Sequence, residues 1–135
     1  MSGMMHPKKI ENLLSLSTKE RYDYFIREVA QFEKIWTIGT DEGYVIFHDK
    51  EGEEILPIWP HRELAEKCIF KEHKEMGATP ESILLDSFLK NCIPDMMSDG
   101  ILFGVFYDDK REALAVGGKK LMQDIKVEVE EIWGE

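Results

Sequence analysis

Three residues with reactive or metal-binding side chains, His61, Cys68 and His73, fall within one predicted helix. A thiol beside an imidazole would form a nucleophile with its base, but seven residues separate His61 from Cys68, roughly 10 Å along a helix axis. Cys68 and His73 are five residues apart, about 140° around the helix, whereas paired helical ligands usually lie four apart. The spacing therefore predicts neither a Cys–His dyad nor a zinc site, which would need ligands from elsewhere.

Two pairs of neighbouring acids are candidates for acid–base chemistry, Asp41 with Glu42 and Asp108 with Asp109. Both pairs lie in predicted turns, where short acidic side chains accept hydrogen bonds from the nearby backbone. We therefore interpret them as turn residues, and the sequence predicts no catalytic residue here.

The run Gly117-Gly118-Lys119-Lys120 opens a predicted helix. Free amides at a helix start, together with two ammonium groups, suit an anion. The run lacks the glycine spacing of a phosphate-binding loop, so a plain helix-start turn is the favoured interpretation. The sequence accordingly predicts no cofactor and no bound metal.

Aromatic residues give the better indication of a binding surface. Trp36 and Trp59 fall on neighbouring predicted strands, and His61 follows the Trp59–Pro60 junction, where the chain leaves a strand for a helix. One interpretation is an ordinary aromatic core. The other is a groove, rimmed by Trp59 and His61, in which an extended segment or a second subunit docks. Trp133, on an acidic terminal helix, is a candidate interface anchor. The candidate binding surface is Trp36, Trp59, His61 and Trp133.

The predicted elements that position these residues begin with a helix. Ser17 and Glu20 form a capping-box pattern, and apolar residues then recur at helical spacing up to Ala30. Three strands joined by turns follow, namely IWTIGT, YVIFHD and EILPIW, and they predict an antiparallel meander. Pro57 lacks an amide donor, so it predicts an edge or a strand end.

The second half of the chain alternates helices and strands. The patterns predict a helix over 62–74, a strand at SILLD, a helix capped by Asp86 and ended by Pro94, strands at ILFGVFY and ALAV, and a helix after Gly118.

This order predicts an α+β domain with a mainly antiparallel sheet flanked by about four helices. A mixed sheet is the alternative, because a helix separates SILLD from ILFGVFY and would allow one parallel pairing. With 135 residues the chain suits one domain, predicted over 17–135 after a flexible segment at 1–16.

Composition narrows the partners and the compartment. Seventeen Lys and Arg against 27 Asp and Glu give a net charge of −10, which repels phosphate backbones and anionic membranes. Two cysteines are too few for a disulfide framework, and no apolar stretch is long enough to span a bilayer. The composition therefore predicts a cytoplasmic protein that binds no nucleic acid and no membrane.

Several segments in a fixed order resemble an uncharacterised bacterial family, domain of unknown function 2750. They are RYDYFIREVAQFEKIWTI, DEGYVIF, ILPIWPHRELAEKC, LLDSFLKNCIPDM and GILFGVF. The resemblance covers the chain from about residue 17 to the final helix. It implies a compact single-domain cytoplasmic protein, and it brings no activity and no catalytic residue with it.

Two functions remain as hypotheses. The preferred one is a non-enzymatic binding or interaction module, with a protein partner or a second copy as its ligand. The alternative is a small hydrolase whose site gathers His and Asp side chains from different elements, and it requires two or more of His48, His61, Asp41 and Asp86 in one pocket.

Overall fold

The computed structural model describes residues 5–134, and its first element is a short helix, α1 (Pro7–Leu14). Pro7 lies in the first turn, and His6 caps the helix because its Nδ1 accepts a hydrogen bond from the Lys8 amide at 3.0 Å. Leu13 is buried. A helix therefore covers part of the segment for which flexibility was predicted, while residues 1–4 lie outside the described chain.

The second helix, α2 (Thr18–Phe32), begins at the predicted capping box. Ser17 Oγ accepts a hydrogen bond from the Glu20 amide at 3.1 Å, and Glu20 Oε1 accepts one from the Ser17 amide at 3.0 Å. The apolar face of α2 is buried, as its spacing predicted. The helix ends at Glu33, whose φ of 60° is left-handed and turns the chain directly into a strand.

Among the described residues, seven strands form two sheets. In the first, β1 (Lys34–Thr40) pairs antiparallel with β2 (Gly43–Tyr44) and β5 (Thr79–Leu84). The second has the order β3 (Phe47–His48), β4 (Glu54–Ile58), β6 (Leu102–Val105) and β7 (Leu114–Val116), in which only the β4–β6 pair is parallel. An antiparallel and a mixed sheet with helices confirm the predicted α+β class.

The predicted strand YVIFHD is divided between the two sheets. The Val45 amide donates to Ile38 O at 3.0 Å beside β1, whereas Phe47 pairs with Ile55 of β4. Val45 and Phe47 are both buried, so the chain passes from one sheet to the other between them. The two expected hairpins are present, but they belong to different sheets instead of one meander.

Pro57 occupies the interior of β4, not the edge or end that was expected. The neighbouring strand β3 pairs only with Glu54 and Ile55, so the ladder on that side has stopped before Pro57. The carbonyl of Pro57 instead accepts a hydrogen bond from Thr37 Oγ of β1 at 2.7 Å. The proline's missing amide therefore interrupts no ladder bond.

The helix predicted over 62–74 is two helices, α3 (Arg62–Lys67) and α4 (Lys71–Glu75). Between them Cys68 and Ile69 are buried, and Phe70 is extended with a φ of −78° and a ψ of 159°. In a single helix these three consecutive residues would point in different directions, whereas the break lets them all face the core.

The helical segment after β5 is longer than predicted. It runs through α5 (Leu85–Ser87), a π-helical turn η1 (Phe88–Cys92) and α6 (Ile93–Ser98). Asp86 lies in the first turn and does not cap the helix. Pro94 does not end it either, because the wider π-helical turn before the proline accommodates the missing donor.

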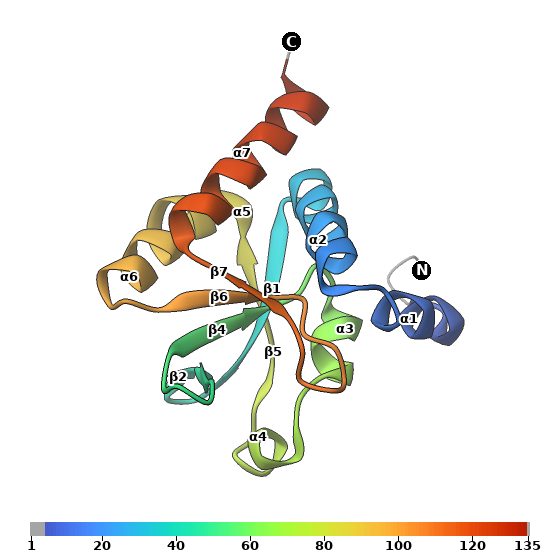
Figure 1. The fold of residues 1–135 in the computed structure, drawn as a ribbon, viewed down its shortest axis with the longest axis vertical. Helices are drawn as coiled ribbons and strands as arrows, with labels where there is room; N and C mark the ends of the chain where they lie inside the picture. The colour runs from blue at the N-terminus through green and yellow to red at the C-terminus, as the bar shows by residue number, and fades with distance from the viewer. Residues whose placement is uncertain (1–4, 135) are drawn as a thin grey trace.

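The last helix, α7 (Gly118–Trp133), packs chiefly against α2. Figure 1 shows α2 and α7 towards one end of the molecule, with α4 at the opposite end and the strands between them. The core between these layers includes Phe25, Trp59, Phe103 and Leu121, each with 0% exposure.

A buried arginine fixes the loop between β6 and β7. Arg21 is 2% exposed, and its guanidinium donates hydrogen bonds to the carbonyls of Leu16, Phe106 and Glu112. Asp108, also buried, lies 3.7 Å from Arg21. In the same loop Trp59 Nε1 donates to the carbonyl of Tyr107 at 3.0 Å. Removal of either donor would leave buried carbonyls without partners.

Trp59→Phe should lower the free energy of unfolding by about 2–3 kcal/mol, because it leaves a cavity and a buried carbonyl without a donor. Trp133→Phe is the matched control, since Trp133 is 57% exposed and its hydrogen bond to Ala30 O is only partly buried. We expect a loss below about 1 kcal/mol there. Urea unfolding monitored by circular dichroism measures both values. Equal losses in the two variants would contradict the buried role of Trp59.

Candidate functional site

The clearest candidate for a binding site is a cleft of about 660 Å³ between the end of α2, the start of β1, the start of α3 and the segment around α1. We call it the His61 cleft. Its lining residues are Met5, His6, Lys9, Glu28, Phe32, Lys34, Trp36, Pro60, His61, Arg62 and Glu63.

A hydrogen-bonded pair of ionisable side chains, Glu28 and His61, lies in this cleft. His61 Nε2 is 2.7 Å from Glu28 Oε1, and the side chains are only 22% and 19% exposed. The Phe32 ring packs edge-on to the imidazole with centroids 5.6 Å apart, and the Tyr24 ring does so at 6.3 Å. The imidazole is therefore held in one orientation, with its second nitrogen left for another partner.

The Tyr24 phenol lies next to the Glu28–His61 pair, and Glu28 affects its pKa. Burial raises the pKa of the Tyr24 phenol to about 12, and the nearby Glu28 carboxylate adds to the rise. The phenol thus stays protonated at neutral pH. Its oxygen is buried and has no hydrogen-bond partner within residues 5–134.

Strand β1 supplies an aromatic and cationic wall. The Lys34 ammonium lies 5.9 Å from the centre of the Trp36 ring. Trp36 exchanges two backbone hydrogen bonds with Trp59, at 2.9 and 2.7 Å. Because backbone groups alternate along an antiparallel strand, the amide and carbonyl of Lys34 point to the same side as those of Trp36. Pro60 and His61 of the facing chain lie outside any strand, and within residues 5–134 no backbone hydrogen bond joins that chain to Lys34.

The charge of the cleft differs from that of the whole chain. Three lysine and arginine side chains line it, Lys9, Lys34 and Arg62, against the two carboxylates Glu28 and Glu63. The chain as a whole has 17 Lys and Arg against 27 Asp and Glu. The lining therefore carries one more positive than negative charge on a protein that is anionic as a whole, and this local surplus favours anionic ligands.

The structure brings together two of the four predicted surface residues, Trp36 and His61. Trp59 does not rim the groove as expected, because it is 0% exposed and its indole nitrogen is satisfied within the core. Trp133 lies elsewhere, on α7, where its Nε1 donates to Ala30 O at 2.8 Å and so caps an otherwise free carbonyl at the end of α2.

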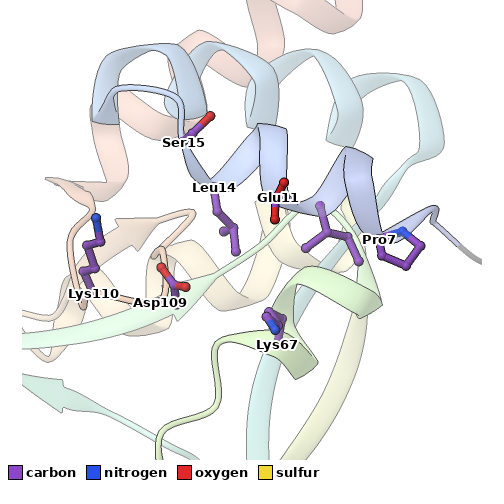
Figure 2. Close-up of a pocket in the computed structure, with 8 residues that line it drawn as sticks. Pro7, Glu11, Leu14, Ser15, Lys67, Asp109 and Lys110 are labelled. Carbon is purple, nitrogen blue, oxygen red and sulfur yellow. The ribbon is translucent and has the colours of Figure 1, made fainter.

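A smaller pocket of about 440 Å³ lies between α1, α3 and the β6–β7 loop. Figure 2 shows Leu14 pointing from α1 into the space bounded by Lys67 and Asp109. Its charged residues balance, with Lys67 and Lys110 against Glu11 and Asp109. The pocket therefore shows no preference for either sign of charge.

A third cavity, of about 570 Å³, surrounds His73 and is called the His73 cavity below. The imidazole stacks on Phe47 with centroids 5.0 Å apart and planes at 14°, and its Nδ1 is buried without a partner in the described chain. Arg111 lies 4.1 Å from the Phe70 ring centre and pairs with Glu72 at 2.7 Å. Burial lowers the pKa of His73, and Arg111 adds to the lowering while Glu72 opposes it.

The other reactive residues from the sequence have structural surroundings. Burial raises the pKa of Cys68 to about 12 and that of Cys92 to about 11, so neither thiol is an activated nucleophile. Asp108 accepts hydrogen bonds from the Lys110 and Glu112 amides, as the turn interpretation predicted. Gly117 is the N-cap of α7.

No three His, Cys, Asp or Glu side chains within residues 5–134 are placed to hold a metal ion. No helix in this part of the chain is long and apolar enough to cross a membrane.

The hydrolase hypothesis required two or more of His48, His61, Asp41 and Asp86 in one pocket, and these residues lie apart. His61 pairs with Glu28, His48 lies 3.5 Å from Glu54 in the His73 cavity, and Asp86 pairs with Lys90 at 3.2 Å. Asp41 is exposed in the turn between β1 and β2. The pocket expected from these four side chains is not formed.

Several lining residues were not found from the sequence. Glu28 was not singled out from the sequence, because no local pattern pairs it with a histidine 33 residues later. Phe32 and Lys34 flank the helix–strand junction at Glu33. One feature of the sequence could have pointed to them, namely the end of an amphipathic helix followed directly by a Trp-containing strand.

The fold and the cleft together define an α+β protein with two small sheets and a cationic, aromatic-lined groove. The chain belongs to the family of proteins of unknown function DUF2750, whose family model matches residues 22–125. The match confirms the resemblance seen in the sequence, and it includes Glu28, Trp36 and His61. No curated protein and no solved structure matches the chain.

The lowered pKa of His73 predicts a loss of stability on acidification. Between about pH 7 and the folded-state pKa, the unfolded chain, with a histidine pKa of about 6.5, binds a proton that the folded chain does not. The free energy of unfolding should therefore fall as the pH is lowered from 7 to 5. His73→Phe should reduce this slope, measured by urea unfolding at each pH.

His48→Phe is the matched control for this measurement, because the His48 side chain is 60% exposed. We expect the pH slope of the unfolding free energy to stay closer to the parent value in His48→Phe than in His73→Phe. A His73→Phe slope equal to that of the parent protein would contradict the assignment.

Proposed function

We propose that this protein is a small non-enzymatic binding module whose His61 cleft takes an extended acidic segment of a protein partner. The observation that carries the proposal is the gathering of Lys9, Lys34 and Arg62 around Trp36 and His61 in a chain of net charge −10. A carboxylate-bearing ligand gains charge-assisted hydrogen bonds in this cleft.

The backbone of β1 supports an extended conformation for the ligand. The open amide and carbonyl of Lys34 offer one pair of main-chain hydrogen bonds, as in recognition by strand addition. Phe32, which is 57% exposed, and the half-buried Trp36 offer apolar contacts to alternate side chains of such a segment.

The same considerations support a protein partner over nucleic acid or a membrane. A net charge of −10 repels long polyanions and anionic surfaces, whereas a short acidic segment meets only the local field of the cleft. The two free cysteines support a cytoplasmic location.

The Glu28–His61 pair favours a second candidate function, that of a small hydrolase. A carboxylate that orients an imidazole leaves the other ring nitrogen to act as a general base towards water. Chromogenic esters and phosphate monoesters test this candidate with the parent protein and with His61→Gln. Turnover that disappears in His61→Gln would support the hydrolase, and rates equal to buffer for both proteins would contradict it for these substrates.

Charge reversal in the cleft should weaken the binding of an acidic peptide. The probe is a fluorescein-labelled octapeptide of alternating Glu and Val, followed by fluorescence anisotropy. We expect Lys34→Glu with Arg62→Glu to raise its Kd at least about tenfold, because each substitution replaces an attraction by a repulsion. Added salt should also weaken binding by the parent protein.

Two controls separate the cleft from the total charge. Lys90→Glu with Lys110→Glu changes the net charge by the same amount at positions outside the cleft, and it should change Kd less than about threefold. An octapeptide of alternating Ser and Val should bind more weakly than the acidic one. Equal affinity of the two peptides, or equal loss in the two double variants, would overturn the proposal.

A further inference from the structure

The end of α7, residues 127–134, carries an acidic surface with exposed apolar side chains, and we call it the α7 tail. Its carboxylates are Glu128, Glu130 and Glu131, and no lysine or arginine occurs among these residues. Val127 and Trp133 are 56% and 57% exposed. Exposed aromatic and aliphatic side chains among carboxylates are typical of a surface that meets a cationic, aromatic partner.

The charges of the tail and those of the His61 cleft are both left unpaired. Within residues 5–134, the three tail carboxylates form no ion pair, and neither do Lys9, Lys34 and Arg62. The molecule thus presents an unpaired anionic surface and an unpaired cationic one.

These two surfaces adjoin the same end of α2. Trp133 holds the α7 tail beside α2 through its 2.8 Å hydrogen bond to Ala30 O, and Phe32, two residues later, lines the cleft. In Figure 1 the ends of α2 and α7 lie at the same end of the molecule. Because α7 stays helical as far as Trp133, its tail does not bend into the cleft of its own chain.

From this arrangement we propose that the occupant of the His61 cleft is the α7 tail of a second copy of this chain. A two-fold dimer needs a self-complementary surface, in which each contact occurs twice. Here the cationic cleft of each copy receives Glu130 and Glu131 of the other, and exposed Val127 faces Phe32. The inference rests on the proposed function, since it names the partner of the same cleft. The tail enters as a helix, so it uses the charged and apolar lining of the cleft and not the strand-like contact with the Lys34 backbone.

The contact opposes the overall repulsion between two chains of net charge −10 each. The dimer therefore forms only through the local match of opposite charges and is sensitive to substitution there. The ion pairs between the cleft and the tail would lie at the solvent-exposed edge of the interface, where each contributes little. Association is therefore expected to be reversible and concentration-dependent.

A charge-swap experiment tests this dimer by sedimentation equilibrium. The first variant reverses the cleft, Lys34→Glu with Arg62→Glu, and the second reverses the tail, Glu130→Lys with Glu131→Lys. Each variant alone should dimerise at least about tenfold more weakly than the parent protein, because like charges then meet. An equimolar mixture should recover the association, since both contacts of the heterodimer again join opposite charges.

Native mass spectrometry, with one variant labelled with nitrogen-15, identifies the species in the mixture. Matched controls are Lys90→Glu with Lys110→Glu and Glu51→Lys with Glu53→Lys, which change the net charge equally outside both surfaces and should associate like the parent protein. Circular dichroism checks that every variant is folded.

A parent protein that stays monomeric at all soluble concentrations, or a mixture without heterodimer, would overturn the inference. If the acidic octapeptide still binds the cleft in that case, the proposed function stands and only the identity of the partner is wrong. If the octapeptide does not bind either, both proposals fail.

Discussion

The backbone bridge between Trp36 and Trp59 is the contact on which the rest of the site depends. Its two hydrogen bonds, at 2.9 and 2.7 Å, join a strand of one sheet to the end of a strand of the other. The buried Trp59 indole anchors this bridge to the loop after β6. As a consequence His61, two residues after Trp59, lies beside the start of β1 and within reach of Glu28. The core thus fixes the backbone that forms the walls of the cleft, and this backbone carries the charged side chains.

Local chemistry explains which parts of this fold could be predicted. The capping box at Ser17 and the apolar face of α2 depend on residues close in sequence, and the structure contains both. The break between α3 and α4 and the π-helical turn before Pro94 depend on how distant segments pack, so spacing alone did not reveal them. For the same reason the sequence left Trp59 between an aromatic core and the rim of a groove, and its 0% exposure assigns it to the core.

In the candidate site, too, some residues could be predicted from the sequence and others depend on how distant segments pack. Trp36 and His61 stood out by residue type, whereas Glu28, Phe32 and Lys34 became part of the cleft only through contacts between α2, β1 and the turn at Pro60. Net charge was also a partial guide. A value of −10 describes the field far from the molecule, but binding depends on the local field, where Lys9, Lys34 and Arg62 gather. An acidic protein can therefore carry a locally cationic cleft, and this is why the proposed ligands of the His61 cleft are acidic.

An NMR titration tests most directly whether the His61 cleft is a binding site. The chain has three tryptophans, so a nitrogen–proton correlation spectrum contains three indole signals. On addition of the alternating Glu–Val octapeptide, the Trp36 indole signal should move, because Trp36 lines the cleft, while the buried Trp59 signal should move least. A stationary Trp36 signal, with the largest changes around the His73 cavity, would contradict binding in the His61 cleft.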